Sequence, residues 1–395
     1  MQYTSLKKLF IAMALILVVS ACATTPQRLD DQSRDHNGHF TREVDMSPEY
    51  RQVSSVLMQQ AVNDDSLSQH QDAVIFSKGD MLRIKFYDMS EHDGLYQINT
   101  DGSLELPFAP SLKASGHTRN SLRRMLEGEL VRLKWFYADN VKVDVSLVRL
   151  APINVSVFGA VFNAGRVSIN NQPIDKPEDA IQQLGGVHSG GRDLVAGLAA
   201  AGGIRPDADL SHVYLKRDNQ VTRIALNNLV NGVQFGATPA LIEGDIIFVK
   251  SSGFELSQLI KPSQITPPGM RVFMSNLTVP AFNNAQSAVG ADSTRLPYGS
   301  SLLDSAISAN CIGGTHHANA SRSVILITRN YGSKKQLVIS RSINQLLANS
   351  SDSSINPFVM PNDAVACYDS RFSNFRDVAR GLVEIVSPLF LGGVL

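Results

Sequence analysis

Three cysteines are the side chains in this sequence with the clearest capacity for covalent chemistry, and they stand at positions 22, 311 and 367. A thiol can be modified, can ligate a metal ion, or can pair with a second thiol as a disulfide. Cys22 ends an apolar N-terminal run, whereas Cys311 and Cys367 lie in the last quarter of the chain. The first position therefore suggests a modification and the other two suggest a pair.

The N-terminus predicts a signal peptide over residues 1–21. Lys7 and Lys8 precede an apolar run, residues 9–19, that is too short to span a bilayer comfortably. The segment Val19-Ser20-Ala21-Cys22 resembles the bacterial lipobox, in which the cysteine thiol takes diacylglycerol before cleavage. Ala23 stands where an inner-membrane retention signal would place aspartate, which favours the outer membrane. The alternatives are an ordinary signal peptide with a stray cysteine and an uncleaved anchor helix.

Lipidation of Cys22 would leave Cys311 and Cys367 as the remaining thiols of a protein in an oxidising compartment. Two such cysteines tend to form a bridge, so we predict a Cys311–Cys367 disulfide. Two separately buried thiols are the alternative, because the sequence does not establish that the positions are close.

An enzyme needs a constellation of reactive side chains, and the sequence offers none that we can identify. It lacks the HExxH, GxSxG, Walker and GxGxxG motifs. His316 and His317 are adjacent, so on a helix or strand they point apart and chelate poorly. Trp135, the sole tryptophan, could stack on a sugar, although packing in a core or interface is the commoner role. We predict no enzymatic activity, no metal site and no cofactor.

The composition does not imply a strongly charged field around the protein. The chain has 36 Lys and Arg against 36 Asp and Glu, and removal of Lys7 and Lys8 leaves 34 against 36, a net charge of about −2. A nucleic-acid partner is therefore not implied. The length and 43% hydrophobic residues predict two or three domains with substantial cores.

Residues 71–151 predict a compact α+β unit after a polar tether, residues 22–70. A strand-like segment, residues 81–87, follows the turn Lys78-Gly79-Asp80, and the Asp101-Gly102 pair predicts a hairpin between alternating segments. Thr118 can cap a helix whose leucines recur with helical spacing up to Leu133. A strictly alternating strand follows at residues 141–147.

The remainder of the chain shows a weak internal repeat of domain size. Residues 198–203 predict a helix that ends at two glycines, followed by strands at residues 213–217 and 243–249 and a helix-like piece at 224–230. A second copy has a helix at residues 302–307 and strands at 324–329 and 361–367. We therefore expect domains at residues 152–252 and 268–370, with a Ser- and Pro-rich linker between them.

This order of elements resembles that of Wza-like outer-membrane polysaccharide export lipoproteins. Residues 71–151 look like the polysaccharide export domain, and the two repeats look like SLBB (soluble-ligand-binding β-grasp) domains. Gly159-Ala160-Val161-Phe162-Asn163-Ala164-Gly165 departs from the family pattern at Ala164, where proline is usual, and the second copy keeps little of this signature. The resemblance implies a multi-domain α+β protein that forms a closed ring, an octamer in the family, and works with an inner-membrane co-polymerase or ABC-transporter complex.

The C-terminal segment, residues 371–395, predicts an amphipathic helix. One half of its helical wheel is apolar and the other is polar. In a ring of such helices, the apolar face would meet lipid and the polar face would line water. The predicted lipid-facing residues are Phe375, Val378, Leu382, Ile385, Val386 and Leu389. The predicted lumen-facing residues are Arg376, Arg380 and Glu384. A surface helix packed on its own domain is the alternative.

Together these features predict a channel subunit that exports capsular or extracellular polysaccharide across the outer membrane. Its folded domains would lie in the periplasm, and Cys22 would carry the lipid anchor. The alternative is a periplasm-facing lipoprotein that binds a glycan or envelope proteins without forming a pore. An envelope hydrolase with an unrecognised site is a weaker third possibility.

Overall fold

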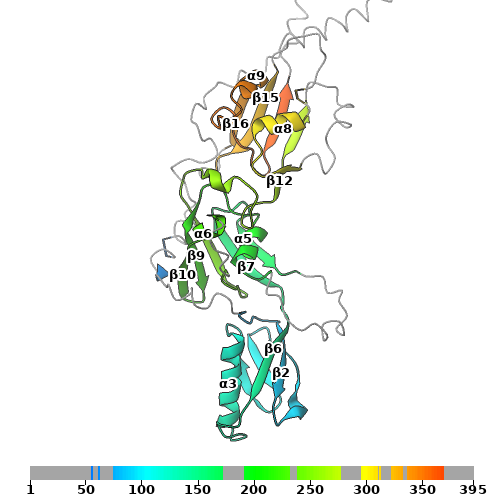
Figure 1. Cartoon of the computed structure of the whole chain (residues 1–395), viewed down its shortest axis with the longest axis vertical. Coiled ribbons are helices and arrows are strands. Elements are labelled where there is room, and N and C mark those ends of the chain that lie inside the picture. The colour runs from blue at the N-terminus through cyan, green and yellow to red at the C-terminus, as the bar shows by residue number, and fades with distance from the viewer. Residues whose placement is uncertain are drawn as a thin grey trace, which may run out of the picture.

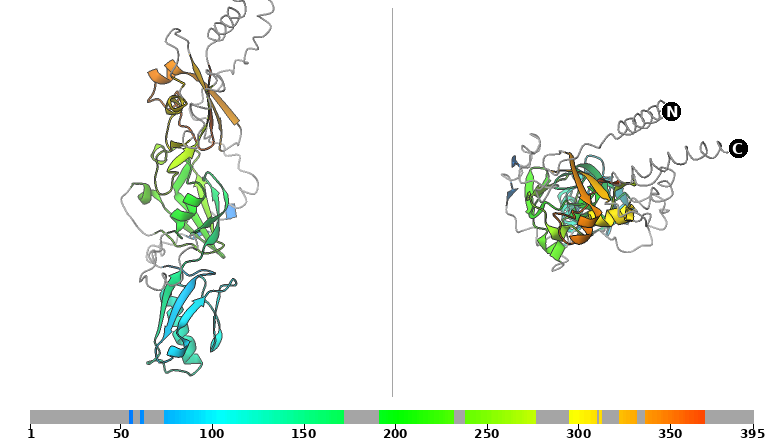
Figure 2. Two further views of the ribbon diagram at one scale, coloured as in Figure 1. Left: turned by 90° about the vertical axis from the view of Figure 1, so that its right-hand side faces the viewer. Right: turned by 90° about the horizontal axis from the view of Figure 1, so that it is seen from above.

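The computed structural model describes residues 55–56, 61–62, 74–171, 191–231, 238–276, 295–309, 311–312, 322–331 and 336–368. They form an elongated molecule whose elements from residue 74 onward follow one another from one end to the other (Figure 1), and a view turned by 90° keeps this shape (Figure 2). Residues 61–62 instead lie beside the middle of the molecule. Strands outnumber helices, so the mixed α+β class predicted from the sequence is confirmed. Three large clusters of buried apolar residues mark three units along the molecule, which we call the first, middle and last units.

The first unit packs one helix against a small antiparallel sheet. Its strands are β2 (Met81–Phe86), β3 (Gly94–Gln97), β4 (Ser103–Leu106), β5 (Ala109–Lys113) and β6 (Val143–Arg149), with the short 3-10 helix η2 (Ser90–His92) and the helix α3 (Arg119–Arg132). The sheet has the order β3-β2-β6, and β4 pairs with β5 in a separate hairpin. The unit is held together because alternate β2 residues and the leucine face of α3 share one buried cluster.

The helix α3 begins where its sequence predicts. The Thr118 hydroxyl accepts the backbone N–H of Ser121, and the Ser121 hydroxyl accepts the N–H of Thr118, so each satisfies a donor at the helix start. Leu122, Leu126 and Leu130 are buried at four-residue intervals. The helix therefore follows from local capping and from one continuous apolar face.

The hairpin predicted at Asp101-Gly102 is wrong. A turn does form there, with Gly102 at φ +88°, but β3 pairs with β2 whereas β4 pairs with β5. Turn residues determine only the local backbone conformation. They do not determine which strand the following strand pairs with.

The middle unit is built on a six-stranded sheet in the order β1-β10-β9-β11-β7-β8. Its strands are β1 (Ala61–Val62), β7 (Ile153–Gly159), β8 (Gly165–Ile169), β9 (Ala208–Arg217), β10 (Gln220–Ile224) and β11 (Ile246–Ser251). Its helices are α5 (Leu194–Ala200), α6 (Asn227–Asn231) and the 3-10 helix η3 (Ser257–Leu259). The helix-like piece predicted at 224–230 begins later than expected, because Ile224 is the last residue of β10.

The last unit repeats the middle one in a shorter form. It contains β12 (Gly269–Arg271), β13 (Phe273–Asn276), β14 (Arg295–Pro297), β15 (Ser323–Arg329), β16 (Gln336–Ser342) and β17 (Ala364–Tyr368). Its helices are α8 (Leu302–Ser308) and α9 (Ile343–Ala348). The order β16-β15-β17-β13 matches β10-β9-β11-β7 in the middle sheet, including the parallel pairing of the last two strands. The internal repeat predicted from the sequence is therefore present as a repeated topology.

Candidate functional site

All of the side chains predicted to contact the membrane or line its pore lie outside the described residues. They are the lipidation residue Cys22 and the residues of the predicted C-terminal helix, Phe375, Arg376, Val378, Arg380, Leu382, Glu384, Ile385, Val386 and Leu389. His316 and His317, considered above as a metal pair, also lie outside the described residues. Within the described residues, no helix combines the length and apolar character needed to cross a membrane. The same residues hold no cluster of three or more His, Cys, Asp or Glu side chains suited to a metal ion.

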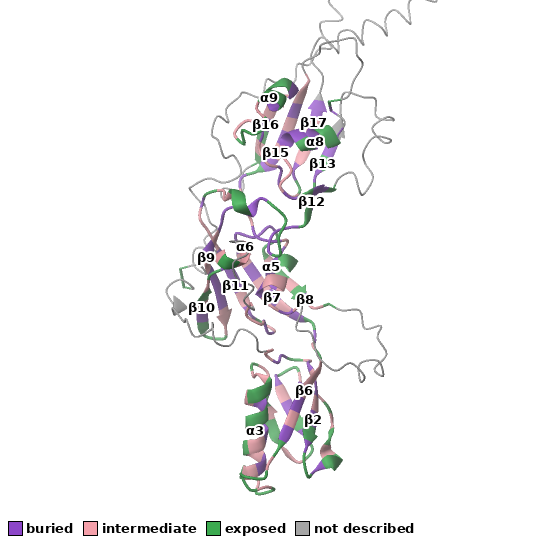
Figure 3. Cartoon of the chain, viewed as in Figure 1, coloured by how far each residue is buried: buried purple, intermediate pink, exposed green. Residues whose placement is uncertain are grey.

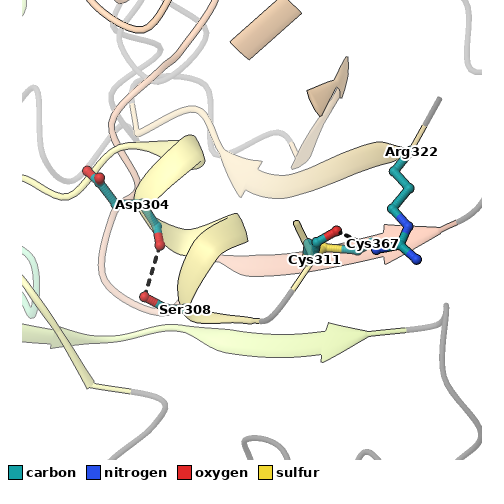
Figure 4. Close-up of a disulfide and its surroundings, with 5 residues drawn as sticks. All are labelled: Asp304, Ser308, Cys311, Arg322 and Cys367. Atoms are coloured by element: carbon teal, nitrogen blue, oxygen red, sulfur yellow. Dashed lines mark hydrogen bonds between the residues drawn. A yellow bond between two sulfur atoms is a disulfide. The ribbon is translucent and has the colours of Figure 1, made fainter. Parts of the chain in front are cut away.

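Cys311 and Cys367 meet in the core of the last unit (Figure 4). Cys311 follows α8 and Cys367 lies on β17, and the two sulfurs are joined with the Cα atoms 5.9 Å apart. Both residues are fully buried, and Arg322 donates from Nη1 to the Cys311 carbonyl oxygen at 3.1 Å. The bridge would therefore tie the end of α8 to the strand behind it.

We expect the purified mature protein to contain this bridge. It closes a loop of 56 residues, which corresponds to at most about 4 kcal/mol of stabilisation through the unfolded chain. Alkylation under denaturing conditions, followed by intact-mass measurement, should modify neither Cys311 nor Cys367 until a reductant is added. Two alkylated thiols in the unreduced protein would show that the cysteines are separately buried.

Three buried aspartates close the same turn in the three units. The Oδ2 atom of Asp80 accepts the backbone N–H of Ser77 at 2.7 Å. Equivalent bonds of 2.9 Å run from Ile242 to Asp245 and from Met360 to Asp363. Gly79, Gly244 and Asn362, one residue before each aspartate, have positive φ, and a strand follows each turn. The turn at Gly79-Asp80, recognised in the sequence, is thus one of three copies of the same arrangement at the start of a strand.

Asp80 also joins the first unit to the middle one. Its Oδ1 atom accepts the Ala151 backbone N–H at 2.8 Å and Nη1 of Arg192 at 2.6 Å. Arg192 lies just before α5, and its Nη2 donates to the Ile75 carbonyl oxygen. The two side chains are 0% and 2% exposed, so this ion pair is shielded from solvent. A pair of this kind stabilises only while both partners are present, since either one alone would be a buried uncompensated charge.

A second joint connects the middle and last units through aromatic and guanidinium groups. Phe162 lies edge-on to Tyr298 and Tyr331, each with ring centroids 5.8 Å away. The Arg205 guanidinium, held by Asp207 at 2.6 Å, lies 5.2 Å from the centroid of the Tyr331 ring. Burial raises the pKa of Tyr331 to about 12, so its phenol stays neutral at physiological pH. These contacts favour one orientation of the two units.

Neither joint could be recognised from the sequence, because the residues that meet across it are far apart along the chain. Arg192 is 112 positions from Asp80 and belongs to no motif. Trp135 was expected to pack in a core or an interface, but it is not a core residue, since it is 49% exposed at the free end of the first unit.

Comparisons with known proteins point to one process. Residues 68–148 match the family model described as polysaccharide biosynthesis/export protein. The polysialic acid transport protein KpsD of Escherichia coli is 26% identical over 177 residues, which cover 44% of this chain and 28% of KpsD. The EPS I polysaccharide export outer membrane protein EpsA of Ralstonia nicotianae is 26% identical over 202 residues, covering 48% of this chain and 46% of that protein. EpsA of Ralstonia solanacearum is 21% identical over 304 residues, covering 69% and 75% of the two chains. The chain thus spans less than half the length of KpsD and of the first EpsA, and the resemblance to polysaccharide export proteins is confirmed.

Proposed function

From the premise that residues 68–148 carry a polysaccharide export domain, we propose that this chain is the subunit of a channel for capsular or extracellular polysaccharide in the outer membrane. The observation that carries the proposal is the match of that domain, together with relatives whose names describe polysaccharide transport and export. The identity of the exported polymer, the assembly into a ring and the partner proteins are all parts of this proposal.

The arrangement of the units supports a periplasmic shaft. In this proposal the first unit is the export domain expected at 71–151, and the middle and last units are the SLBB-like domains expected at 152–252 and 268–370. Their shared strand order supports an origin as two copies of one module. Two joints made of buried contacts favour a stiff elongated subunit, and copies of such a subunit can pack side by side around an axis.

Membrane attachment would come from the two ends of the chain. Cys22 would carry the lipid, residues 22–70 would tether it to the first unit, and the helix at 371–395 would line the pore. The protein would do no covalent chemistry, so an inner-membrane co-polymerase or ABC-transporter complex would supply the energy. The family resemblance implies eight subunits.

The proposal is tested by the assembly state and by export in the same cells. The lipoprotein purified in mild detergent should appear as a closed ring by electron microscopy, and deletion of its gene should leave polymer inside the envelope. A monomer that binds envelope components, in cells that still export polymer without it, would favour the non-channel alternative.

Replacing Cys22 with serine should block lipid attachment and leave uncleaved precursor in the inner membrane. The physical reason is that the hydroxyl of serine is not the thiol to which diacylglycerol is transferred. Radiolabelled palmitate should enter the wild-type protein and a Cys311→Ser control, but not Cys22→Ser. Label in the Cys22→Ser protein would show that the lipobox assignment is wrong.

A further inference from the structure

Three connections of the first unit bring aromatic rings together at the end that points away from the middle unit. Phe86 pairs with Val143 at this end of the sheet, whereas the other end of β6 leads into β7. We call the resulting surface the aromatic end. Its members are Tyr87, His92, Phe108, Trp135 and Tyr137. It occupies the lower tip of the molecule in Figure 1, where Figure 3 shows many exposed residues.

The rings form a graded stack from the core to the solvent. Phe108 lies edge-on to the buried Phe86, with centroids 5.2 Å apart. Trp135 in turn lies 5.6 Å from Phe108 and 6.4 Å from His92. The indole is therefore held by rings behind it while about half of its surface remains open to solvent. Such a fixed and accessible ring loses little conformational entropy when a ligand stacks on it.

Two further exposed tyrosines lie on the same connections. Tyr137 is 84% exposed and Tyr87 is 57% exposed, although both are large side chains that usually bury much of their area. They come from different connections, which the bond from the Tyr87 backbone N–H to the Lys142 carbonyl holds together at 3.2 Å. Exposed rings gathered on neighbouring connections are typical of an interaction surface.

The charges around the rings distinguish between two possible ligands, an anionic lipid surface and a sugar. The exposed acidic residues on these connections are Asp88, Glu91, Asp93 and Asp139, against the exposed cations Lys134 and Lys142. A net acidic rim disfavours an anionic lipid surface, which attracts segments rich in Lys and Arg. Carboxylates instead accept hydrogen bonds from hydroxyl groups, and aromatic faces stack on the apolar C–H faces of a sugar ring.

We propose that the aromatic end is a binding site for neutral sugar units of a glycan, which stack on Trp135, Tyr87 and Tyr137. The inference rests on the proposed function, because polysaccharide is the ligand of this chemistry that an export protein would meet. The acidic rim adds hydrogen bonds to sugar hydroxyls and disfavours acidic groups at the contact itself.

Binding at the aromatic end can be followed by tryptophan fluorescence, because Trp135 is the only tryptophan in the chain. The full-length lipoprotein is titrated with maltoheptaose and, separately, with polymer isolated from the producing cells, while tryptophan fluorescence is recorded. We expect a saturable change in emission and protection of Trp135 from a neutral quencher. Tyr137→Ala and Tyr87→Ala should each weaken binding about three- to tenfold, the value of one aromatic contact. Phe254→Ala removes a ring that is 53% exposed in the middle unit and should leave binding unchanged.

Any other result would contradict the proposal that the aromatic end binds sugars. No change in emission with either glycan, or equal loss in Phe254→Ala, excludes sugar stacking at the aromatic end. A response to phosphatidylglycerol vesicles but to neither glycan would make it a membrane contact. The failure of the proposed function is separable, since it would appear as polymer export that persists when the gene is deleted. Loss of export on deletion without glycan binding would leave the channel proposal standing and reject only this site.

Discussion

Replacing Asp80 with alanine is expected to lower the free energy of unfolding by about 3–5 kcal/mol, because it leaves the buried Arg192 guanidinium without its counter-ion. The same change removes the acceptor of two backbone N–H groups, those of Ser77 and Ala151. The loss should be measured by chemical denaturation of the purified protein. Limited proteolysis should also show faster cleavage near residues 150–152, where the first and middle units join.

Asp144→Ala is the matched control for this change. It removes an aspartate from the same unit that also pairs with an arginine, Arg119 at 3.0 Å, but the two side chains are 41% and 59% exposed. Exposed pairs contribute under about 1 kcal/mol. Equal losses in the two variants would mean that the Asp80–Arg192 pair does not hold the joint. Asp80→Asn should be intermediate, because the amide keeps an acceptor oxygen and loses the charge.

Replacing Leu382 with aspartate is expected to prevent the predicted C-terminal helix from inserting, while the three described units still fold. The helical wheel of the segment puts Leu382 on the apolar face, where a carboxylate would meet acyl chains at a cost of about 3 kcal/mol per subunit. A ring multiplies this cost by the number of its subunits. A tag placed after Leu395 should be reachable at the surface of intact cells in the wild type and hidden in Leu382→Asp.

Glu384→Gln provides the comparison on the opposite face. This change alters a residue two positions away that is predicted to face water, so the tag should remain reachable and export should continue. A tag that is never reachable in cells that export polymer would show that the helix does not cross the membrane. It would then be a surface helix packed on its own domain.

Local elements could be predicted from the sequence because the interactions that form them span only a few residues. The helix α3 follows from Thr118 and from leucines at four-residue spacing, and the strand β2 follows from its alternating apolar side chains. The end of α5 follows from Gly202 and Gly203, both with positive φ. The repeat was visible for the same reason, since each copy carries the same order of local signals.

The pairing of strands could not be predicted from those signals. The turn at Gly102 fixes the backbone over a few residues, but whether β4 joins β3 or β5 depends on how Leu104 and Leu106 enter the core shared with α3. Strand partners are selected by the burial of whole faces, which no turn residue encodes.

Contacts between distant positions of the chain were decided only by the tertiary structure. It brings Cys311 to Cys367 across 56 residues and Arg192 to Asp80 across 112 residues. It also leaves Trp135 half exposed, although an aromatic run such as Trp135-Phe136-Tyr137 more commonly packs in a core or an interface. The sequence by itself determined which side chains are apolar, charged or reactive and what local backbone each favours. Which of them are buried together depends on the whole chain. The reason is that the free energy gained by removing apolar surface from water comes from cores to which many segments contribute at once.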